Sequence, residues 1–574
     1  MAVVFLVLPI HLFHHESILY PVWESIPSLD SIWYLEDPRY FSDFRYHALK
    51  LLFHRMTMKR HFRQTQSFYS SLKRRRIPKI LYVDHEGVRE WWRQHSSSFS
   101  FHLFQVHDGP LEQRWRRAGL WESMTVHPSP SISFLDETDP FLSPGETEVP
   151  SFSLTDRVKR KKRGKRLSFA QFYQHQRVKY DLLLVAPLSS SSASASVPAG
   201  GKWSLDTENR RSIPAHVSLP AIPRSTPSSS GTSREYAEAI EYVRRHFADH
   251  PCVDDLRDQC LVMYPLDHAS AMDLLRVFWK RRLPCFGPYQ DALDPRQPFL
   301  WHSALSIPLN CGLLTDRQVV DDWRRIRRRR DDDAALVAPL ASEEGWIRQV
   351  VGWRPYCLWM YKKHGETLRS MNFWRARRSM NGLYARLWNA STDIDPVDDA
   401  MRAVRTYGYM NHIQRLMVVG SFLFMLQIKP EEVYRCFMEW TLDAYDWVMV
   451  PNVYGMSQCV DGASLMMTRP YFSSANYICK MGPSYCPVRS RSLSASPSWT
   501  RKWNTIYHHF LHTNTTSLRR FYVTAMMLAS SQKKRKKNIP VNNDLKESSS
   551  LSFVQLVRLL TTTTARTRTT TILS

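Results

Sequence analysis

Residues Tyr409–Phe422 read YMNHIQRLMVVGSF and residues Leu442–Gln458 read LDAYDWVMVPNVYGMSQ. The first segment has the pattern of an apolar helix, and His412 and Arg415 lie three residues apart on one face of it. An unpaired buried charge is costly, and Asp443 is the nearest candidate partner downstream. Two interpretations remain open at this point. Arg415 and Asp443 pair beside a bound ligand that His412 faces, or they form a structural ion pair inside a helical bundle.

The composition favours a large globular protein with a polyanionic partner. A chain of 574 residues is expected to hold two or more domains, and 43% hydrophobic residues provide a large core. The formal net charge of +25 is high. It suits nucleic acid best, and an anionic membrane surface is the alternative.

The nine cysteines are odd in number and scattered, and none forms a C-x-x-C pair. This pattern argues against a disulfide scaffold and a zinc site, and it favours a reducing compartment. Met1–Ile10 is apolar but lacks a basic leader and a small-residue cleavage site, so we expect a buried strand there rather than a signal peptide. No apolar run reaches the roughly 20 residues that cross a bilayer.

Residues 1–118 alternate between strand-like and helix-like segments. The predicted strands are residues 3–9, 31–38, 77–84 and 100–106. The predicted helices between them are residues 44–63 and 87–95. Strands separated by helices indicate an α/β domain of the Rossmann-like kind with a parallel sheet. The segment contains no G-x-G-x-x-G, so nothing in it indicates a dinucleotide site.

Residues 119–235 lose this alternation and are rich in Pro, Ser, Thr and Gly. We expect a long interdomain connection with low-complexity inserts, such as SSSSASAS at 189–196. Two segments interrupt it: a predicted helix at 168–184 and a polar, turn-rich motif at 200–214.

Residues 236–528 carry 3.6-residue periodicity and predict an all-α domain, and residues 529–574 are polar and predict a disordered basic tail. Four basic runs lie at 73–76, 159–166, 324–330 and 533–537. Such runs are solvated faces, phosphate-binding segments or nuclear localisation signals. We expect a nuclear protein or, failing that, another soluble intracellular location.

Several long segments, in order along the chain, resemble the bacterial photolyase-related family of iron–sulfur photolyases and cryptochromes that repair 6-4 photoproducts. They are RRLPCFGPYQDALDP (281–295), FLWHSALSIPLNCGLL (299–314), GWRPY (352–356), NHIQRLM (411–417) and DAYDWVMVPNVYGMSQ (443–458). YLEDPRYFSDFRYHALKLLFHRMTMK (34–59) and GGKWSLDTENRR (200–211) are similar to the same family. The resemblance covers nearly all of residues 1–515, with inserts.

The resemblance implies an N-terminal domain that can hold a lumazine- or folate-type antenna chromophore, and an all-α domain that binds FAD. Within 302–310 it assigns Ser303, Ser306 and Asn310 to the cofactor, with backbone N–H groups for the pyrophosphate. It also places Arg415 and Asp443 beside the flavin ring and assigns Asn452 to the flavin.

The resemblance also implies a light-driven reaction in which reduced FAD passes an electron to a lesion flipped out of ultraviolet-damaged DNA. His412 is the expected proton donor, through an imidazole of near-neutral pKa. Trp353, Arg354 and Tyr471 are expected to line the lesion pocket.

Electrons are expected to reach the flavin along an aromatic relay. Trp388 and Tyr445 match relay positions, and Cys436 stands where a further relay tryptophan is found in the family.

The chain departs from the family at the cluster and at the pocket. The four cluster cysteines correspond here to Cys486, Arg489, Arg501 and a residue near Pro396, and one thiolate cannot hold a cluster. We therefore expect no iron–sulfur cluster. At the pocket, Pro355 replaces a glutamate and Asn411 replaces a second histidine.

Three functions remain open: a photolyase acting on ultraviolet-damaged DNA, a cryptochrome-like light receptor without repair, and a basic nucleic-acid-binding protein on a degenerate photolyase scaffold. His412 and the positive charge favour the first. Pro355, the lost cluster ligands and the basic tail favour the others. A monomer without a membrane partner is expected.

Overall fold

The computed structural model describes residues 2–72, 77–95, 99–142, 167–185, 197–224, 232–329, 338–486, 498–537 and 552–561. The basic runs at 73–76 and 159–166 and the inserts at 189–196 and 225–231 lie outside these residues. None of the described helices is long and apolar enough to span a bilayer.

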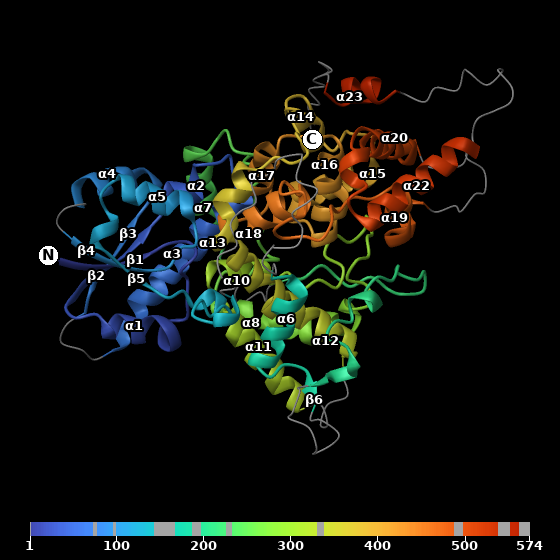
Figure 1. Ribbon diagram of the computed structural model, residues 1–574. Coiled ribbons are helices and arrows are strands. Elements are labelled where there is room, and N and C mark those ends of the chain that lie inside the picture. Colours follow the sequence, from blue (N-terminus) through green and yellow to red (C-terminus); the bar gives the residue numbers. More distant parts are fainter. Residues whose placement is uncertain are drawn as a thin grey trace.

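The N-terminal part of the chain forms a parallel sheet, as predicted, and the sheet has five strands (Figure 1). Its strands are β1 (Ala2–Val7), β2 (Leu29–Leu35), β3 (Lys79–Val83), β4 (Phe99–Phe104) and β5 (Met124–His127), in the order β3-β2-β1-β4-β5. Val4–Val7 of the central strand are buried, which explains the continuous apolar run there. Sequence analysis missed β5, whose four residues lack a buried face.

Helices cover both faces of this sheet (Figure 1). They are α1 (Tyr20–Ser25), α2 (Pro38–Phe41), α3 (Ala48–Ser71), α4 (His85–His95) and α5 (Gly109–Arg117). The predicted helix at 44–63 begins instead at Ala48, because the His47 side chain accepts the Leu49 N–H at 3.1 Å and caps it.

A second layer joins α3 to the helical part of the chain. The helix α7 (Ser233–His246) packs along α3, with Arg60 of α3 paired to Glu235 at 3.0 Å and to Asp267 at 2.8 Å. The sequence predicted this helix as the start of the all-α domain. In the structure it covers the sheet domain, and the domain boundaries themselves stay a prediction.

The remaining elements are helical, which confirms the predicted fold class. They are α6 (Phe169–Lys179), α8 (His268–Val277), η9 (Phe278–Arg282), α9 (Leu283–Phe286), α10 (Ser306–Cys311), α11 (Asp316–Arg328), α12 (Leu340–Ile347), η11 (Arg348–Trp353), α13 (Arg354–Ser370), α14 (Leu383–Trp388), α15 (Asp395–Tyr407), η12 (Gln414–Gly420), α16 (Ser421–Met425), α17 (Pro430–Trp440), α18 (Asp446–Met449), η13 (Val450–Ser457), α19 (Ala475–Met481), α20 (Ser498–Thr513), α21 (Thr515–Leu518), α22 (Tyr522–Lys537) and α23 (Phe553–Thr561). Two short strands, β6 (Leu184–Val185) and β7 (Val197–Pro198), pair in the connection.

The prediction of a disordered tail from residue 529 is wrong for the residues described there. The helix α22 continues to Lys537, and α23 packs against α14 and α20. Phe553 stacks on His509 with ring centres 3.5 Å apart, and Leu556 and Leu560 are buried. An amphipathic face docked on the body therefore orders this segment.

Buried ion pairs connect the two parts of the molecule. The Asp446 carboxylate accepts hydrogen bonds from Tyr361, Arg369 and Tyr434 of the helical part. Arg39 of the sheet domain lies 3.3 Å from the same carboxylate and 2.8 Å from Asp108. These contacts fix the sheet domain against α18, next to the site described below.

Candidate functional site

A cavity of about 310 Å³ lies among the helices that carry the predicted site residues. It is lined mainly by apolar side chains, with a few polar groups converging on it, as in small-molecule and cofactor sites. Of the predicted residues, the lining includes Ser303, Ser306, Asn310, Trp353, Arg354, His412, Arg415, Asp443 and Asn452. The structure therefore brings together nine residues drawn from distant parts of the sequence.

Three of the helices around the cavity contain π-helical turns, at η11, η12 and η13. Such turns are frequent at functional sites because they redirect side chains within a helix. They carry Trp353, Arg415 and Asn452 respectively. At Gly420 a Cβ atom would lie 2.4 Å from both the Arg415 carbonyl oxygen and Ser457 Oγ, so only glycine allows η12 and η13 to approach this closely.

Arg415 and Asp443 form the predicted ion pair. Arg415 Nη2 lies 2.9 and 3.0 Å from the two carboxylate oxygens, and its Nε donates to the Met410 carbonyl at 2.8 Å. Ser306 Oγ donates to Asp443 Oδ2 at 2.7 Å. Both side chains are largely buried and line the cavity, so the pair presents a cation and a carboxylate to a ligand.

His412 faces the cavity from the first turn of its helix. Asn411 caps that turn: its Oδ1 accepts the Gln414 N–H at 2.9 Å, while Gln414 Oε1 accepts the Asn411 N–H at 3.1 Å. The surrounding protein, with Arg415 nearby, lowers the pKa of His412, although its side chain is exposed to solvent at the cavity. The shift leaves His412 mostly neutral at pH 7, and a near-neutral pKa stays a prediction.

Trp353 is held by a residue that sequence analysis did not select. Its ring stacks on Phe169 of α6 with centres 3.7 Å apart and planes 9° apart. The helix α6 begins at Phe169 because Ser168 and Gln171 form a capping box. Periodicity predicted this helix but gave no indication of the stacking partner.

Arg354 is directed toward α10. Its guanidinium donates to Asn310 Oδ1 at 2.5 Å and to the Leu309 carbonyl at 2.9 Å, and it lies over the Trp447 ring. Asn310 Nδ2 in turn donates to the Asp443 carbonyl at 2.9 Å. Arg354 and Asn310 thus brace the cavity wall, and Pro355 follows in the first turn of α13, where proline is tolerated.

Three predicted residues lie outside the cavity lining. Tyr471 is half-buried beneath Arg469, whose guanidinium carbon lies 4.7 Å from the centre of the Tyr471 ring, and its role at a lesion stays a prediction. Tyr445 donates to or accepts from His54 Nε2 at 3.0 Å. Trp388 lies at the end of α14, with its ring centre 6.4 Å from that of Tyr384.

The cavity wall fits a polar ligand such as FAD. Among the described residues, Gln290 Oε1, His302 Nε2 and Arg354 Nε are buried without hydrogen-bond partners, and all three residues line the cavity. Buried polar atoms are usually paired, so these atoms favour a ligand with donors and acceptors of its own. Ser303 and Asn452 add two further polar side chains. The helix α10 is only six residues long, so phosphates depend on these side chains more than on its N-terminus.

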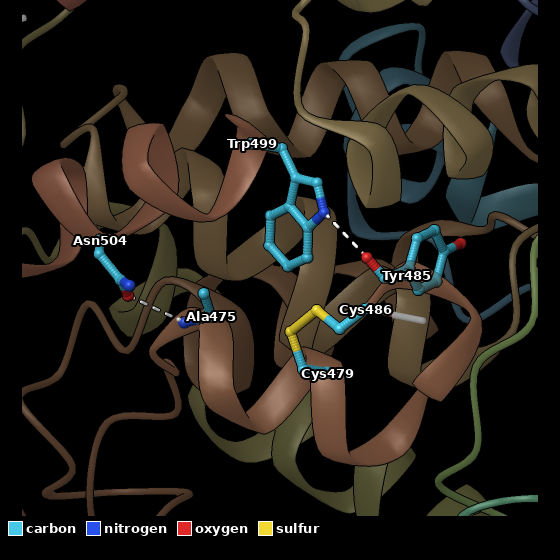
Figure 2. The surroundings of a disulfide bond; sticks show 6 residues. All are labelled: Ala475, Cys479, Tyr485, Cys486, Trp499 and Asn504. Atoms are coloured by element: carbon cyan, nitrogen blue, oxygen red, sulfur yellow. Dashed lines mark hydrogen bonds between the residues drawn. A yellow bond between two sulfur atoms is a disulfide. The ribbon is translucent and has the colours of Figure 1, made fainter. Parts of the chain in front are cut away.

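The residues at the cluster positions do not fit an iron–sulfur cluster. Cys486 is joined to Cys479 in a disulfide (Figure 2). Pro396 is buried in the first turn of α15, and Arg501 is exposed on α20. Arg489 lies outside the described residues. Trp499 Nε1 donates to the Tyr485 carbonyl at 3.4 Å beside the disulfide. No group of three potential metal ligands occurs in the described part of the chain. The disulfide itself was not predicted, because scattered cysteines carry no pairing signal.

Comparisons with known proteins agree with this geometry. The family model described as deoxyribodipyrimidine photo-lyase-related protein matches residues 5–254. A (6-4) photolyase from Agrobacterium fabrum is 32% identical over 361 residues, which cover 62% of this chain and 64% of that protein. The uncharacterized protein R855 of Acanthamoeba polyphaga mimivirus is 38% identical over 98 residues, 17% of this chain and 72% of that protein.

A solved structure, that of a bacterial class III photolyase from Agrobacterium tumefaciens, has a TM-score of 0.44 and 16% identity, with 79% of each chain covered. The matched part of the chain thus spans just under two thirds of the curated photolyase. The family-model match, the 32% identity and the nine residues gathered around one cavity fit a protein of the photolyase/cryptochrome family.

Proposed function

We propose that the chain is a light-dependent DNA photolyase that binds FAD in this cavity and repairs a pyrimidine photoproduct, most specifically the 6-4 lesion. The observation that carries the proposal is the buried Arg415–Asp443 pair in the same cavity wall as His412 and the partnerless polar atoms. When bound, reduced FAD supplies the photoexcited electron that the lesion accepts and later returns.

The chain's own residues would bind the flavin, orient the flipped base and protonate the lesion. Arg415 and Asp443 offer a cation and a carboxylate to the flavin ring, with Asn452 on the neighbouring η13. The Trp353 ring, fixed by Phe169, gives a flipped base a flat apolar surface. His412 starts neutral. A lesion that gains negative charge beside it favours uptake of a proton from solvent by the exposed imidazole, which then donates that proton to the lesion.

DNA is the proposed partner. The net charge of +25 favours a phosphate backbone, so we expect binding to weaken as salt rises. We propose a monomer in the nucleus, in keeping with the lysine-rich end of α22.

An antenna chromophore belongs at the carboxyl edge of the sheet, but the cavity lined by Ile10, Tyr40 and His107 there is only about 10 Å³. Side chains have to move for an antenna to bind.

His412→Ala tests the assigned role. The variant is expected to keep its FAD and to lose at least 100-fold of its light-driven repair of an oligonucleotide with one 6-4 lesion. His216→Ala, at an exposed position outside the cavity lining, is the matched control and keeps full repair. Full repair activity in the His412→Ala variant would contradict the assignment of His412 as the proton donor. FAD binding without repair in the unmodified protein would favour the second candidate, a cryptochrome-like receptor. Pro355, in the first turn of α13 next to Arg354, is the residue that favours this candidate.

A further inference from the structure

A buried lysine of the sheet domain lies behind the cavity wall that carries Asp443. Lys50 of α3 is 1% exposed, and its Nζ donates a hydrogen bond to the Ala444 carbonyl at 2.5 Å. The same Nζ lies 4.5 Å from the ring centre of Tyr46 and 5.0 Å from that of Tyr445. Ala444 directly follows Asp443, which lines the cavity, so Lys50 holds the backbone of the segment that presents this carboxylate.

This amine lacks the partner that a buried charge normally has. Among the residues that the structure describes, no carboxylate lies within 4.0 Å of Lys50 Nζ, whose contacts are one carbonyl oxygen and two aromatic faces. Such groups attract an ammonium but carry no net negative charge. Burial lowers the pKa of Lys50 to about 7, and Asp443 is the carboxylate that opposes this shift most strongly.

The charges around Asp443 therefore do not balance. Arg415 and Asp443 compensate each other as an ion pair, and His412 is mostly neutral at pH 7. Arg354 is a further cation of the cavity wall, but it is directed toward α10, where the phosphates of FAD are expected. Lys50 is the positive charge left over beside the ion pair, and a buried cation is costly unless an anion joins it. This imbalance favours a ligand that brings negative charge to the Asp443 side of the cavity.

We propose that Lys50 is a positioning residue for the flavin: acting across the Asp443 segment, its ammonium makes the site bind reduced FAD more tightly than oxidised FAD. The inference rests on the proposed function, because it requires FAD in the cavity. Two electrons and one proton, added to the neutral isoalloxazine ring, leave the ring with one negative charge. This charge supplies the anion that Lys50 lacks, and attraction through the protein wall is stronger than in water. The electrons come from an added reductant, which is dithionite in the test below.

Lys50→Met and Lys50→Gln in the full chain separate the charge of Lys50 from its hydrogen bond. Both variants lose the charge, whereas glutamine keeps an N–H donor for the Ala444 carbonyl. Anaerobic titration measures the Kd of each protein for oxidised FAD and for FAD held reduced with dithionite. Both variants are expected to bind reduced FAD about 10-fold more weakly than the unmodified protein and oxidised FAD equally well. For a two-electron couple, this change shifts the midpoint potential of bound FAD by about 30 mV to more negative values, which equilibration with a redox dye measures independently.

Lys59→Met is the matched control for the lost charge. Lys59 lies on the same helix, half-buried over the Tyr82 ring at 3.9 Å and outside the cavity lining, so its loss should leave both affinities unchanged. The apoproteins of the Lys50 variants should resist urea at least as well as the unmodified apoprotein, because removal of an unpaired buried charge offsets the lost contacts.

Three outcomes would overturn the role of Lys50. Unchanged affinities in both Lys50 variants would exclude any role. Equal losses for oxidised and reduced FAD, or full recovery in Lys50→Gln, would mean that the side chain only holds the Ala444 backbone. Unmodified protein that binds FAD without repairing a lesion would contradict the photolyase function and leave the role of Lys50 standing. Unmodified protein that binds no FAD would overturn both.

Discussion

Asp443 is the residue through which most of the site is connected. Its carboxylate holds Arg415 and Ser306, and its backbone carbonyl holds Asn310. Asn310 then accepts from Arg354, so one residue, through its carboxylate and its backbone carbonyl, braces both walls of the cavity. Removing a buried acid of this kind destabilises the fold mainly because its buried partners are then left unpaired.

Asp443→Asn is expected to lower the free energy of unfolding by about 3 kcal/mol, because Arg415 then keeps a buried charge without its partner. FAD content should fall in parallel. Urea unfolding and the flavin absorbance of the purified variant measure the two effects. The double variant Arg415→Met with Asp443→Asn should regain much of the stability without regaining FAD. Equal stability of the single and double variants would contradict this view of the pair.

Pattern reasoning identified this pair but not its surroundings. The three-residue spacing of His412 and Arg415 and the polar character of Asp443 within an apolar segment were readable along the chain. The hydrogen bonds of Arg354 and the stacking of Phe169 on Trp353 join residues 44 and 184 positions apart, so no local pattern encodes them. The lowered pKa of His412 depends on the protein around it and on Arg415, a neighbourhood that also appears only in three dimensions.

The π-helical turns of η12 and η13 determine how the cavity wall closes. Their close contact at Gly420 sets the positions of Arg415 and, on the facing element, Asn452. The sequence predicted an apolar helix within residues 409–422. The π turn is set by packing against a neighbour, which helical periodicity does not report.

Gly420→Ala is expected to push η12 and η13 apart and to cost about 1–3 kcal/mol of unfolding free energy, because the new methyl group meets backbone and Ser457 at 2.4 Å. FAD binding should weaken with it. Gly365→Ala on α13 is the matched control: its Cβ meets only the Tyr361 ring, at 3.3 Å or more, so the substitution should be close to neutral. Thermal unfolding and FAD titration compare the two. Equal effects of both alanines would argue against a special contact at Gly420.

The elements that the sequence missed share a physical cause. The strand β5 has four residues and no buried face, and α23 is a nine-residue helix that acquires order by docking on α14 and α20. Short elements depend on tertiary contacts more than on their own propensity. The long buried strand β1 and the periodic helices were predictable for the opposite reason.

Across the whole molecule, a buried histidine cluster ties the sheet domain to the helical part. His61 Nδ1 lies 2.6 Å from Tyr34 Oη, and His15 stacks on His61 with ring centres 4.3 Å apart. His268 of α8 lies next to His61. Burial, with neighbouring histidines, lowers the pKa of His15 to about 3 and of His268 to about 4, and it lowers that of His61 well below its usual value.

These shifts predict acid sensitivity. The folded pKa values lie below the ordinary 6.5, so the unfolded chain binds protons first as the pH falls. The free energy of unfolding that the neutral, buried histidines contribute is fully present above about pH 6.5 and is lost between pH 6.5 and 4. His61→Gln should remove about one proton, or about 1.4 kcal/mol per pH unit, from the slope of unfolding free energy in this window. Urea unfolding at pH 7 and pH 5 measures it, and His216→Gln should leave the slope unchanged. A slope equal in all three proteins would exclude the cluster as its source.

The most direct test of the photolyase proposal is one absorption experiment on the purified full-length chain mixed with an oligonucleotide that carries a single 6-4 lesion. Spectra are recorded after reduction, before and after near-ultraviolet illumination. We predict about one bound FAD per chain, and we predict that the absorbance of the lesion disappears in the light but not in the dark. A chain without flavin absorbance, or a flavin-loaded chain that leaves the lesion intact after illumination, would contradict the proposal.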